Sequence, residues 1–208
     1  MIDQAADLPA HTLIVGMTGS GKTTFTIRYL LNVTCACRFL FDDGSRFSRR
    51  LRVTPAYTAR QVEDALDSRW VVFNPARMFP DDYAAGFAWF CQWVFDCAGR
   101  GPGLKVLVVD ELWQWADSRA IPRTLRLCTQ AGRERGVQLF TGTQEPHRVN
   151  SSIVGQAAEL VCFRLQEPKA WACMKELGAD PDQVAALPLG SFIAWNRLSG
   201  GKLAGKLF

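Results

Sequence analysis

One segment near the start of the chain, Gly16 to Thr23, constrains the fold more than any other feature. It reads Gly-Met-Thr-Gly-Ser-Gly-Lys-Thr and matches the Walker A pattern Gly-x-x-x-x-Gly-Lys-Ser/Thr. The apolar run 12–15 before it predicts a strand, and the residues after it predict a helix over about 22–31. A glycine-rich turn in this position directs backbone N–H groups and the positive end of a helix dipole at phosphate oxygens. The pattern therefore predicts a nucleotide-binding α/β fold.

We expect the residues of this turn to hold the phosphates of ATP. Lys22 would reach the β- and γ-phosphates, and the Thr23 hydroxyl would bind Mg²⁺. Thr24 is placed either to touch the α-phosphate or to serve only as a helix-entry residue. A chance glycine-rich turn is the alternative, and the flanking strand and helix argue against it. The predicted nucleotide contacts are Gly16, Thr18, Gly19, Ser20, Gly21, Lys22, Thr23 and Thr24.

Two acidic residues follow the most strand-like run of the chain, residues 104–109. Ligands of open α/β sheets bind beyond the carboxyl ends of strands, so both acids are expected near the phosphates. Asp110 would hold Mg²⁺ directly or through water, and Glu111 would polarise the attacking water as a general base. An acid that activates water favours an ATPase over a kinase, which must exclude water. The alternative is a solvated strand end.

Short β-rich runs alternate with helical patterns along the chain, which is typical of a mostly parallel sheet covered by helices on both faces. We expect a three-layer P-loop NTPase fold in a single domain over 1–208, with 190–208 as a strand or hairpin extension. Glycines 200 and 201 predict the hairpin turn. Strands are predicted at 12–15, 38–41, 70–73, 104–109, 137–141, 160–165 and 191–197, and helices at 22–31, 84–98, 122–135 and 169–177.

Composition narrows the class of protein. Hydrophobic residues make up 48% of the chain and charged residues 21%, which excludes a protein that is disordered over most of its length. The net charge of +4 permits a nucleic-acid partner without requiring one. The seven cysteines have no paired Cys-x-x-Cys spacing and predict reduced, mostly buried thiols. The N-terminal sequence lacks the features of a secretory signal, so export is not expected.

The segment 84–98 is apolar on nearly every face and carries several aromatic residues. About fifteen residues is short of the roughly twenty that span a bilayer, and Gln92 and Asp96 interrupt the run. We therefore expect no transmembrane segment and predict a buried helix. The alternative is a surface that docks on a membrane or on a partner protein.

The segment 130–146 resembles the FtsK/HerA superfamily of DNA-pumping ATPases. It reads Gln-Ala-Gly-Arg-Glu-Arg-Gly-Val-Gln-Leu-Phe-Thr-Gly-Thr-Gln-Glu-Pro, and in that superfamily a helix ending in Arg-x-x-Gly runs into a strand that finishes with Thr-Gln-x-Pro. The resemblance implies that Gln144 senses the γ-phosphate or the attacking water. It also implies that Arg133 is an arginine finger for a neighbouring subunit's ATP, with Arg135 as the alternative. Glu145 departs from many relatives, which leaves the chemistry of this loop open.

The resemblance covers residues 12–177, and the chain length is similar to that of the genome-packaging ATPases of tailless, membrane-containing icosahedral bacteriophages. It implies an ATP-hydrolysing translocase of double-stranded DNA, a viral packaging motor that uses ATP and Mg²⁺. The assembly implied is a homo-oligomer, with a hexameric ring as the expected form. A capsid vertex protein or a membrane protein is a further partner to consider, and the expected location is the host cytoplasm or the virion.

Two groups of arginines are candidates for DNA contact, which in a packaging motor would be made mainly to phosphates. Both groups have the bland alternative of a solvated charged face. Arg46, Arg49, Arg50 and Arg52 form one group, and Arg119, Arg123 and Arg126 form the other. The rival functions are another FtsK/HerA-type DNA-transfer ATPase, a P-loop kinase, and a scaffold protein of the zonula-occludens-toxin-like type that does not act on DNA.

Overall fold

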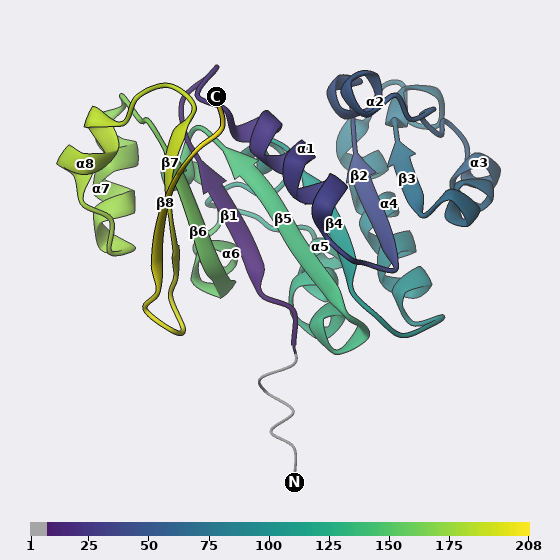
Figure 1. Cartoon of the computed structure of the whole chain (residues 1–208). Coiled ribbons are helices and arrows are strands. Elements are labelled where there is room, and N and C mark those ends of the chain that lie inside the picture. Colours follow the sequence, from purple (N-terminus) through teal and green to yellow (C-terminus); the bar gives the residue numbers. More distant parts are fainter. Residues whose placement is uncertain (1–7) are drawn as a thin grey trace, which may run out of the picture. The chain divides into compact units, whose positions relative to one another are not determined.

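The structure, a computed structural model, describes residues 8–208. In this part of the chain, eight strands form a mostly parallel sheet flanked by helices, in the order β3-β2-β4-β5-β1-β6-β7-β8 (Figure 1). The predicted α/β fold with a mostly parallel sheet is confirmed. Two compact units make up the chain, and each is described by itself. Of the described residues, unit 1 holds 8–10, Asn32–Asp110 and Pro122–Leu139, and unit 2 holds His11–Leu31, Glu111–Ile121 and Phe140–Phe208.

The strands and helices match most of the predicted ranges to within a few residues. The strands are β1 (His11–Val15), β2 (Cys37–Phe41), β3 (Trp70–Phe73), β4 (Lys105–Val109), β5 (Val137–Thr143), β6 (Ala157–Phe163), β7 (Ser191–Asn196) and β8 (Lys202–Lys206). The α-helices are α1 (Lys22–Asn32), α2 (Arg46–Leu51), α3 (Ala59–Asp64), α4 (Tyr83–Ala98), α5 (Arg123–Thr129), α6 (Ser151–Gln156), α7 (Pro168–Glu176) and α8 (Pro181–Ala186). Short 3₁₀ helices are η1 (Ala65–Ser68), η2 (Pro75–Arg77), η3 (Leu112–Gln114), η4 (Ala131–Arg135) and η5 (Pro146–Arg148).

Unit 2 is built around β1, which is buried along its whole length between β5 and β6. Both pairings are parallel, and Val15 at the end of β1 is level with Thr143 of β5 and Cys162 of β6. Helix α1 lies on one face of this sheet (Figure 1), where Tyr29 stacks on Phe140 with 4.2 Å between ring centroids. Such a ring pair adds about 0.5–1.5 kcal/mol to the burial of the two side chains. Because Val15, Thr143 and Cys162 are level in the register, the carboxyl ends of β1, β5 and β6 lie side by side, and the chain runs from the end of β1 into α1.

The predicted hairpin at the C-terminal end of unit 2 is present. Strand β7 runs antiparallel to β6, and β8 runs antiparallel to β7. Gly200 in the turn has φ +71°, a left-handed conformation that glycine adopts without steric cost. The hairpin completes the edge of the sheet that begins with the parallel strands of unit 2.

Unit 1 has β2 at its centre, parallel to β3 on one side and to β4 on the other. The long aromatic helix α4 packs on these strands. Phe87 and Phe90 of α4 are fully buried, with ring centroids 5.1 Å from Phe41 and 5.2 Å from Phe73. The core of this unit is therefore aromatic, as the composition of the segment 84–98 indicates.

The outer face of α4 is covered by polar side chains of the same unit. Trp93 Nε1 donates to Glu63 Oε1 at 2.7 Å, and the Arg135 guanidinium lies 3.8 Å from the centroid of the Phe95 ring. The prediction of a buried helix is thus correct for one face, while the aromatic rings of the other face are half-buried. Over residues 8–208, no helix combines the length and the apolar character needed to cross a bilayer.

The segment that carries the first group of candidate DNA-contact arginines, Arg46 to Arg52, is mostly the helix α2. The carboxylate of Asp42 caps this helix. Asp42 Oδ1 accepts a hydrogen bond from Phe47 N at 3.1 Å, and Oδ2 accepts one from Ser48 N at 2.8 Å. These acceptors satisfy two backbone N–H groups that the start of a helix leaves unpaired.

The predicted helix over 122–135 is also shorter than expected. Helix α5 ends at Thr129, and the chain continues as the 3₁₀ helix η4. Gln130 has φ −100° and ψ −82°, which lies outside the α-helical region and breaks the hydrogen-bond pattern. The short helices α3, α6 and α8 were not predicted, because six residues carry too little periodicity to be recognised.

All seven cysteines are reduced, and five of them are buried. Burial raises the pKa of the Cys37 thiol and of the Cys162 thiol to about 12. These thiols remain protonated at neutral pH, which is typical of structural rather than reactive cysteines.

Candidate nucleotide site

The glycine-rich turn, which we call the P loop (Gly16 to Thr23), is anchored by the two strands beside β1. Gly16 N donates to Thr143 O of β5 at 3.2 Å, and Met17 N donates to Arg164 O at 2.9 Å, directly after β6. The turn therefore lies at the carboxyl edge of three parallel strands, where open α/β sheets bind their ligands. Helix α1 begins within the turn at Lys22.

Three glycines of the P loop have positions that other residues would not tolerate. Gly19 and Gly21 have φ +74° and +120°, both in the region that L-residues rarely adopt. A Cβ atom on Gly16 would lie 2.6 Å from Phe163 Cβ and 2.6 Å from Ser20 Oγ. The spacing of the glycines in the sequence is thus explained by backbone conformation and by close packing against β6.

Lys22 is 7% exposed, and its ammonium group lies inside the P loop. Its Nζ donates to Gly16 O at 2.7 Å and to Met17 O at 3.3 Å. The same Nζ is 3.9 Å from Glu111 Oε1. A lysine in this position carries its positive charge on the inner surface of the turn.

Glu111 has a backbone conformation that turns the chain sharply after β4. Its φ of 47° and ψ of 54° lie in the left-handed region, which costs a non-glycine residue roughly 1–2 kcal/mol. Strain of this kind is concentrated at functional sites. The side chain is directed at the end of β5, where Gln144 Nε2 donates to Oε1 at 2.7 Å and Gln144 N donates to Oε2 at 3.2 Å.

Gln144 connects Glu111 to the P loop. Its Oε1 accepts a hydrogen bond from Thr18 Oγ1 at 2.6 Å, while its Nε2 serves Glu111. Gln144 follows Thr143, the residue that is level with Val15 in the parallel register. Unit 2 therefore brings together four residues that the sequence predicts for one site, namely Thr18, Lys22, Glu111 and Gln144. Thr23 and Thr24 lie half-buried in the first turn of α1.

The C-terminal hairpin supports the P loop from the other side. Gly190 N donates to Ser20 O at 3.1 Å, and a Cβ on Gly21 would lie 2.9 Å from Leu207 Cδ1. The buried Ser20 Oγ has no hydrogen-bond partner within residues 8–208. A buried hydroxyl without a partner in a turn lined by backbone N–H groups is a site that suits a phosphate oxygen.

The other predicted site residues belong to unit 1. Asp110 Oδ2 lies 3.5 Å from Arg46 Nη1, so one arginine of the predicted DNA-contact group pairs with the predicted Mg²⁺ ligand. Arg133 lies on η4, where its Nε donates to Pro9 O at 3.2 Å. Arg135, the alternative finger, contacts Phe95, and its Nη1 donates to Phe95 O at 2.9 Å.

Trp113 was not predicted, although its indole lies at the site. Its Nε1 donates to Glu111 Oε2 at 3.2 Å. The sequence contains no signal for this contact, since it depends on the left-handed turn at Glu111. The contacts of Gly190 and Leu207 with the P loop were missed as well, because the hairpin is distant from the P loop in the sequence.

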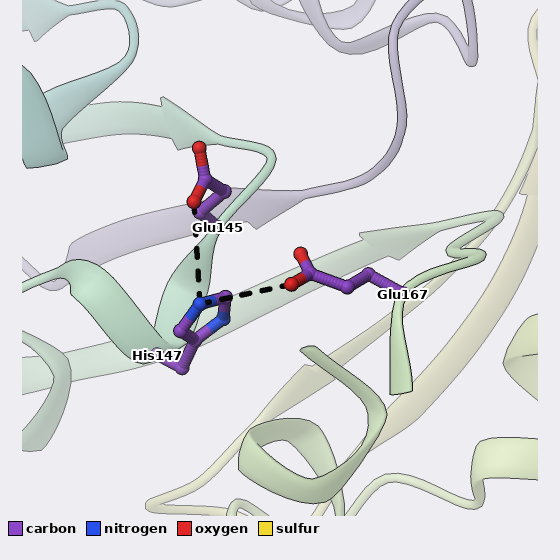
Figure 2. A group of neighbouring side chains, drawn as sticks. All are labelled: Glu145, His147 and Glu167. Carbon is purple, nitrogen blue, oxygen red and sulfur yellow. Dashed lines mark ion pairs between the residues drawn. The ribbon is translucent and has the colours of Figure 1, made fainter. Parts of the chain in front are cut away.

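A cluster of ionisable side chains follows Gln144 at the surface of unit 2. Figure 2 shows His147 Nε2 directed toward two carboxylates, Glu145 Oε2 at 4.0 Å and Glu167 Oε1 at 3.9 Å. Glu145, the residue that departs from the family pattern, also pairs with Arg148 at 3.1 Å. The unusual glutamate is thus part of an ion-pair cluster beside the site.

A comparison with models of known protein families gives no match. The chain is 29% identical to Protein P9 of Pseudoalteromonas phage PM2 over 167 residues, which cover 80% of this chain and 73% of Protein P9. A second likeness is to a solved structure, the genome-packaging NTPase B204 of Sulfolobus turreted icosahedral virus 2 in complex with AMPPCP. The TM-score is 0.72 at 18% identity, and the match covers 96% of this chain and 98% of B204.

VirB4 of Thermoanaerobacter pseudethanolicus is similar as well, with a TM-score of 0.71 at 12% identity, over 95% of this chain and 89% of VirB4. The likeness extends over nearly the whole of both viral and bacterial structures. The expected resemblance to viral genome-packaging ATPases is therefore confirmed at the level of the fold. The chain has the α/β P-loop fold found in the genome-packaging NTPase B204 and in VirB4.

Proposed function

We propose that this protein hydrolyses ATP and uses the energy to move double-stranded DNA, as the packaging motor of a virus. The observation that carries the proposal is the arrangement of Lys22, Glu111 and Gln144 around one P loop. The fold shared with the packaging NTPase B204 and the similarity to a phage protein support the viral role.

The P loop has the features that a triphosphate requires. The first N–H groups of α1 have no partners within the helix, and the helix dipole is positive at this end. The left-handed glycines turn the backbone toward the phosphates, and the buried Ser20 hydroxyl is available to a phosphate oxygen. We assign the phosphate contacts to Gly16 and to residues 18–24, with Lys22 on the β- and γ-phosphates.

Hydrolysis follows from the groups that face Lys22. A water oxygen attacks the γ-phosphorus, the bond to the bridging oxygen of ADP breaks, and Glu111 takes the proton of the water. Gln144 holds the water or the γ-phosphate through its amide, which already reaches both Glu111 and Thr18. Lys22 offsets the negative charge that develops on the transferred group.

Mg²⁺ would neutralise the phosphates and is assigned to Thr23 and, from the sequence, Asp110. The Thr23 hydroxyl stands directly after Lys22, and a hydroxyl with a carboxylate is the oxygen donor set that Mg²⁺ prefers.

We assign Arg133 the role of a finger that acts on the ATP of a neighbouring subunit in a homo-oligomeric ring. A guanidinium that reaches the transferred phosphoryl group is worth on the order of 10³ in rate or more. Within residues 8–208, the side-chain hydrogen bond described for Arg133 is the one from its Nε to Pro9 O at 3.2 Å, and this bond would break when the guanidinium reaches a partner subunit. Activity is therefore expected to rise with protein concentration.

ATP turnover is expected to increase when double-stranded DNA is added to the purified protein. The exposed arginines of α2 are the proposed contacts, and phosphate contacts of this kind weaken steeply with salt. The double variant Arg49→Glu/Arg50→Glu should bind DNA at least about tenfold more weakly and lose most of the stimulation. The measurement is the ATPase rate as a function of DNA, protein and salt concentration.

The matched control reverses two exposed lysines on α7, Lys169→Glu/Lys175→Glu, which changes the net charge equally. This variant should respond to DNA as the wild type does. If the ATPase rate did not change with added DNA at any protein concentration, the proposed action on DNA would be wrong and only the proposed ATP hydrolysis would remain. Transfer of phosphate to a small-molecule hydroxyl would favour the kinase alternative.

A further inference from the structure

Trp113 is placed to control the orientation of the Glu111 carboxylate. The indole Nε1 donates to Glu111 Oε2 at 3.2 Å, and the backbone N of Gln144 donates to the same oxygen at 3.2 Å. The second oxygen, Oε1, accepts from Gln144 Nε2 at 2.7 Å. Both oxygens of the proposed base are therefore held by donors, and rotation of the carboxylate would break the bond to Trp113.

The Trp113 ring is itself held by a planar cation. The Arg148 guanidinium carbon lies 3.7 Å from the centroid of the ring, which is the distance of a stacked cation–π pair. Trp113 belongs to η3 and Arg148 to η5, so the contact ties the turn after Glu111 to the loop after Gln144. Half-buried indoles can otherwise adopt other rotamers, and the guanidinium selects this one.

Arg148 is in turn held by Glu145, one of the three ionisable side chains that Figure 2 shows. Its Nη1 contacts both carboxylate oxygens of Glu145, at 3.1 and 3.3 Å. The other side of Glu145 faces His147, which also faces Glu167. The contacts form a continuous series from the surface cluster, through Arg148 and Trp113, to Glu111.

We propose that Trp113 is a positioning residue for Glu111 and that Arg148, held by Glu145, keeps the indole in place. The inference rests on the proposed hydrolysis of ATP, because it assigns Trp113 a role in aiming the base of that reaction. In the contacts described above, Trp113, Arg148 and Glu145 are connected to the P loop through Glu111 and Gln144 and make no direct contact with it. The effect of Trp113 should therefore appear in the chemical step and not in ATP binding.

Trp113→Phe tests the hydrogen bond alone, since phenylalanine keeps a ring face for Arg148 and lacks the N–H donor. We expect kcat to fall by about tenfold, because small errors in the aim of a catalytic group are costly, while KM and ATP affinity change by less than about twofold. Arg148→Lys keeps the positive charge beside Glu145 but cannot stack as a plane, and should lower kcat by about threefold.

The matched control is Trp171→Phe in the same unit, where Nε1 donates to Leu165 O at 3.1 Å. This variant should keep the wild-type kcat and KM. In a Glu111→Gln background, Trp113→Phe should cause no further loss, because the residue that it positions is already inactive. Full additivity of the two losses would instead assign Trp113 a role that is independent of Glu111.

An NMR experiment tests the contact without hydrolysis. Seven tryptophans give seven indole N–H signals, and the one that is lost in Trp113→Phe belongs to Trp113. We expect this signal to shift in Glu111→Gln, while the Trp171 signal stays in place. Wild-type hydrolysis with an unchanged kcat in Trp113→Phe would overturn the inference and leave the proposed function standing. Absence of hydrolysis in the wild type would overturn both.

Discussion

Glu111→Gln is expected to bind ATP with an affinity within about twofold of the wild type, and to hydrolyse it about 10² to 10⁴ times more slowly. Glutamine has nearly the same shape, so the P loop and Lys22 are left as they are. An amide cannot accept the proton of the attacking water, and it can no longer accept at both positions where Gln144 and Trp113 donate. The measurements are ATP affinity by calorimetry and the rate of phosphate release.

Glu176→Gln is the matched control for this prediction, because Glu176 is an exposed carboxylate of α7 in the same unit. Its affinity and its hydrolysis rate should equal those of the wild type. If Glu111→Gln released phosphate at the wild-type rate, the assignment of Glu111 as the general base would be wrong.

Lys22→Ala is expected to lose ATP affinity by about a hundredfold or more, since each charge-assisted hydrogen bond contributes roughly 1.5–3 kcal/mol. The lysine is buried inside the P loop and supplies the positive charge nearest to Glu111 among the contacts described. Its loss also removes the bond to Gly16 O that closes the turn. Calorimetric titration with ATP measures the effect directly.

The control for Lys22→Ala is Lys169→Ala, which removes an exposed lysine with the same change of charge. It should bind ATP as the wild type does. If Lys22→Ala bound ATP with the wild-type affinity, the assignment of the P loop as the phosphate site would be wrong.

The P loop and the position of Gln144 beside it could both be predicted from the sequence. The P loop could be recognised in the sequence because its turn needs backbone conformations that glycine adopts most easily, as the positive φ values of Gly19 and Gly21 show. The parallel register that sets Thr143 level with Val15 explains why Gln144 lies beside the turn. Local pattern and strand order were sufficient for these residues.

Other features depend on backbone turns and side-chain contacts that the sequence patterns considered above do not predict. The side chain of Asp42 caps α2, a helix of six residues that carries too little periodicity to be predicted. The left-handed turn at Glu111 is what brings Trp113 to the carboxylate, and a β-strand pattern followed by two acids does not predict it. The packing of Leu207 against the P loop likewise follows from the completed sheet.

The central claim is that Lys22, Glu111 and Gln144 act together on one triphosphate. A crystal structure of the protein with AMPPCP and Mg²⁺ tests it most directly. We predict the γ-phosphate within hydrogen-bond distance of Lys22 Nζ, with the Glu111 carboxylate and the Gln144 amide facing it. A nucleotide bound away from the P loop, or a Glu111 carboxylate turned away from the γ-phosphate and directed at solvent, would contradict the account.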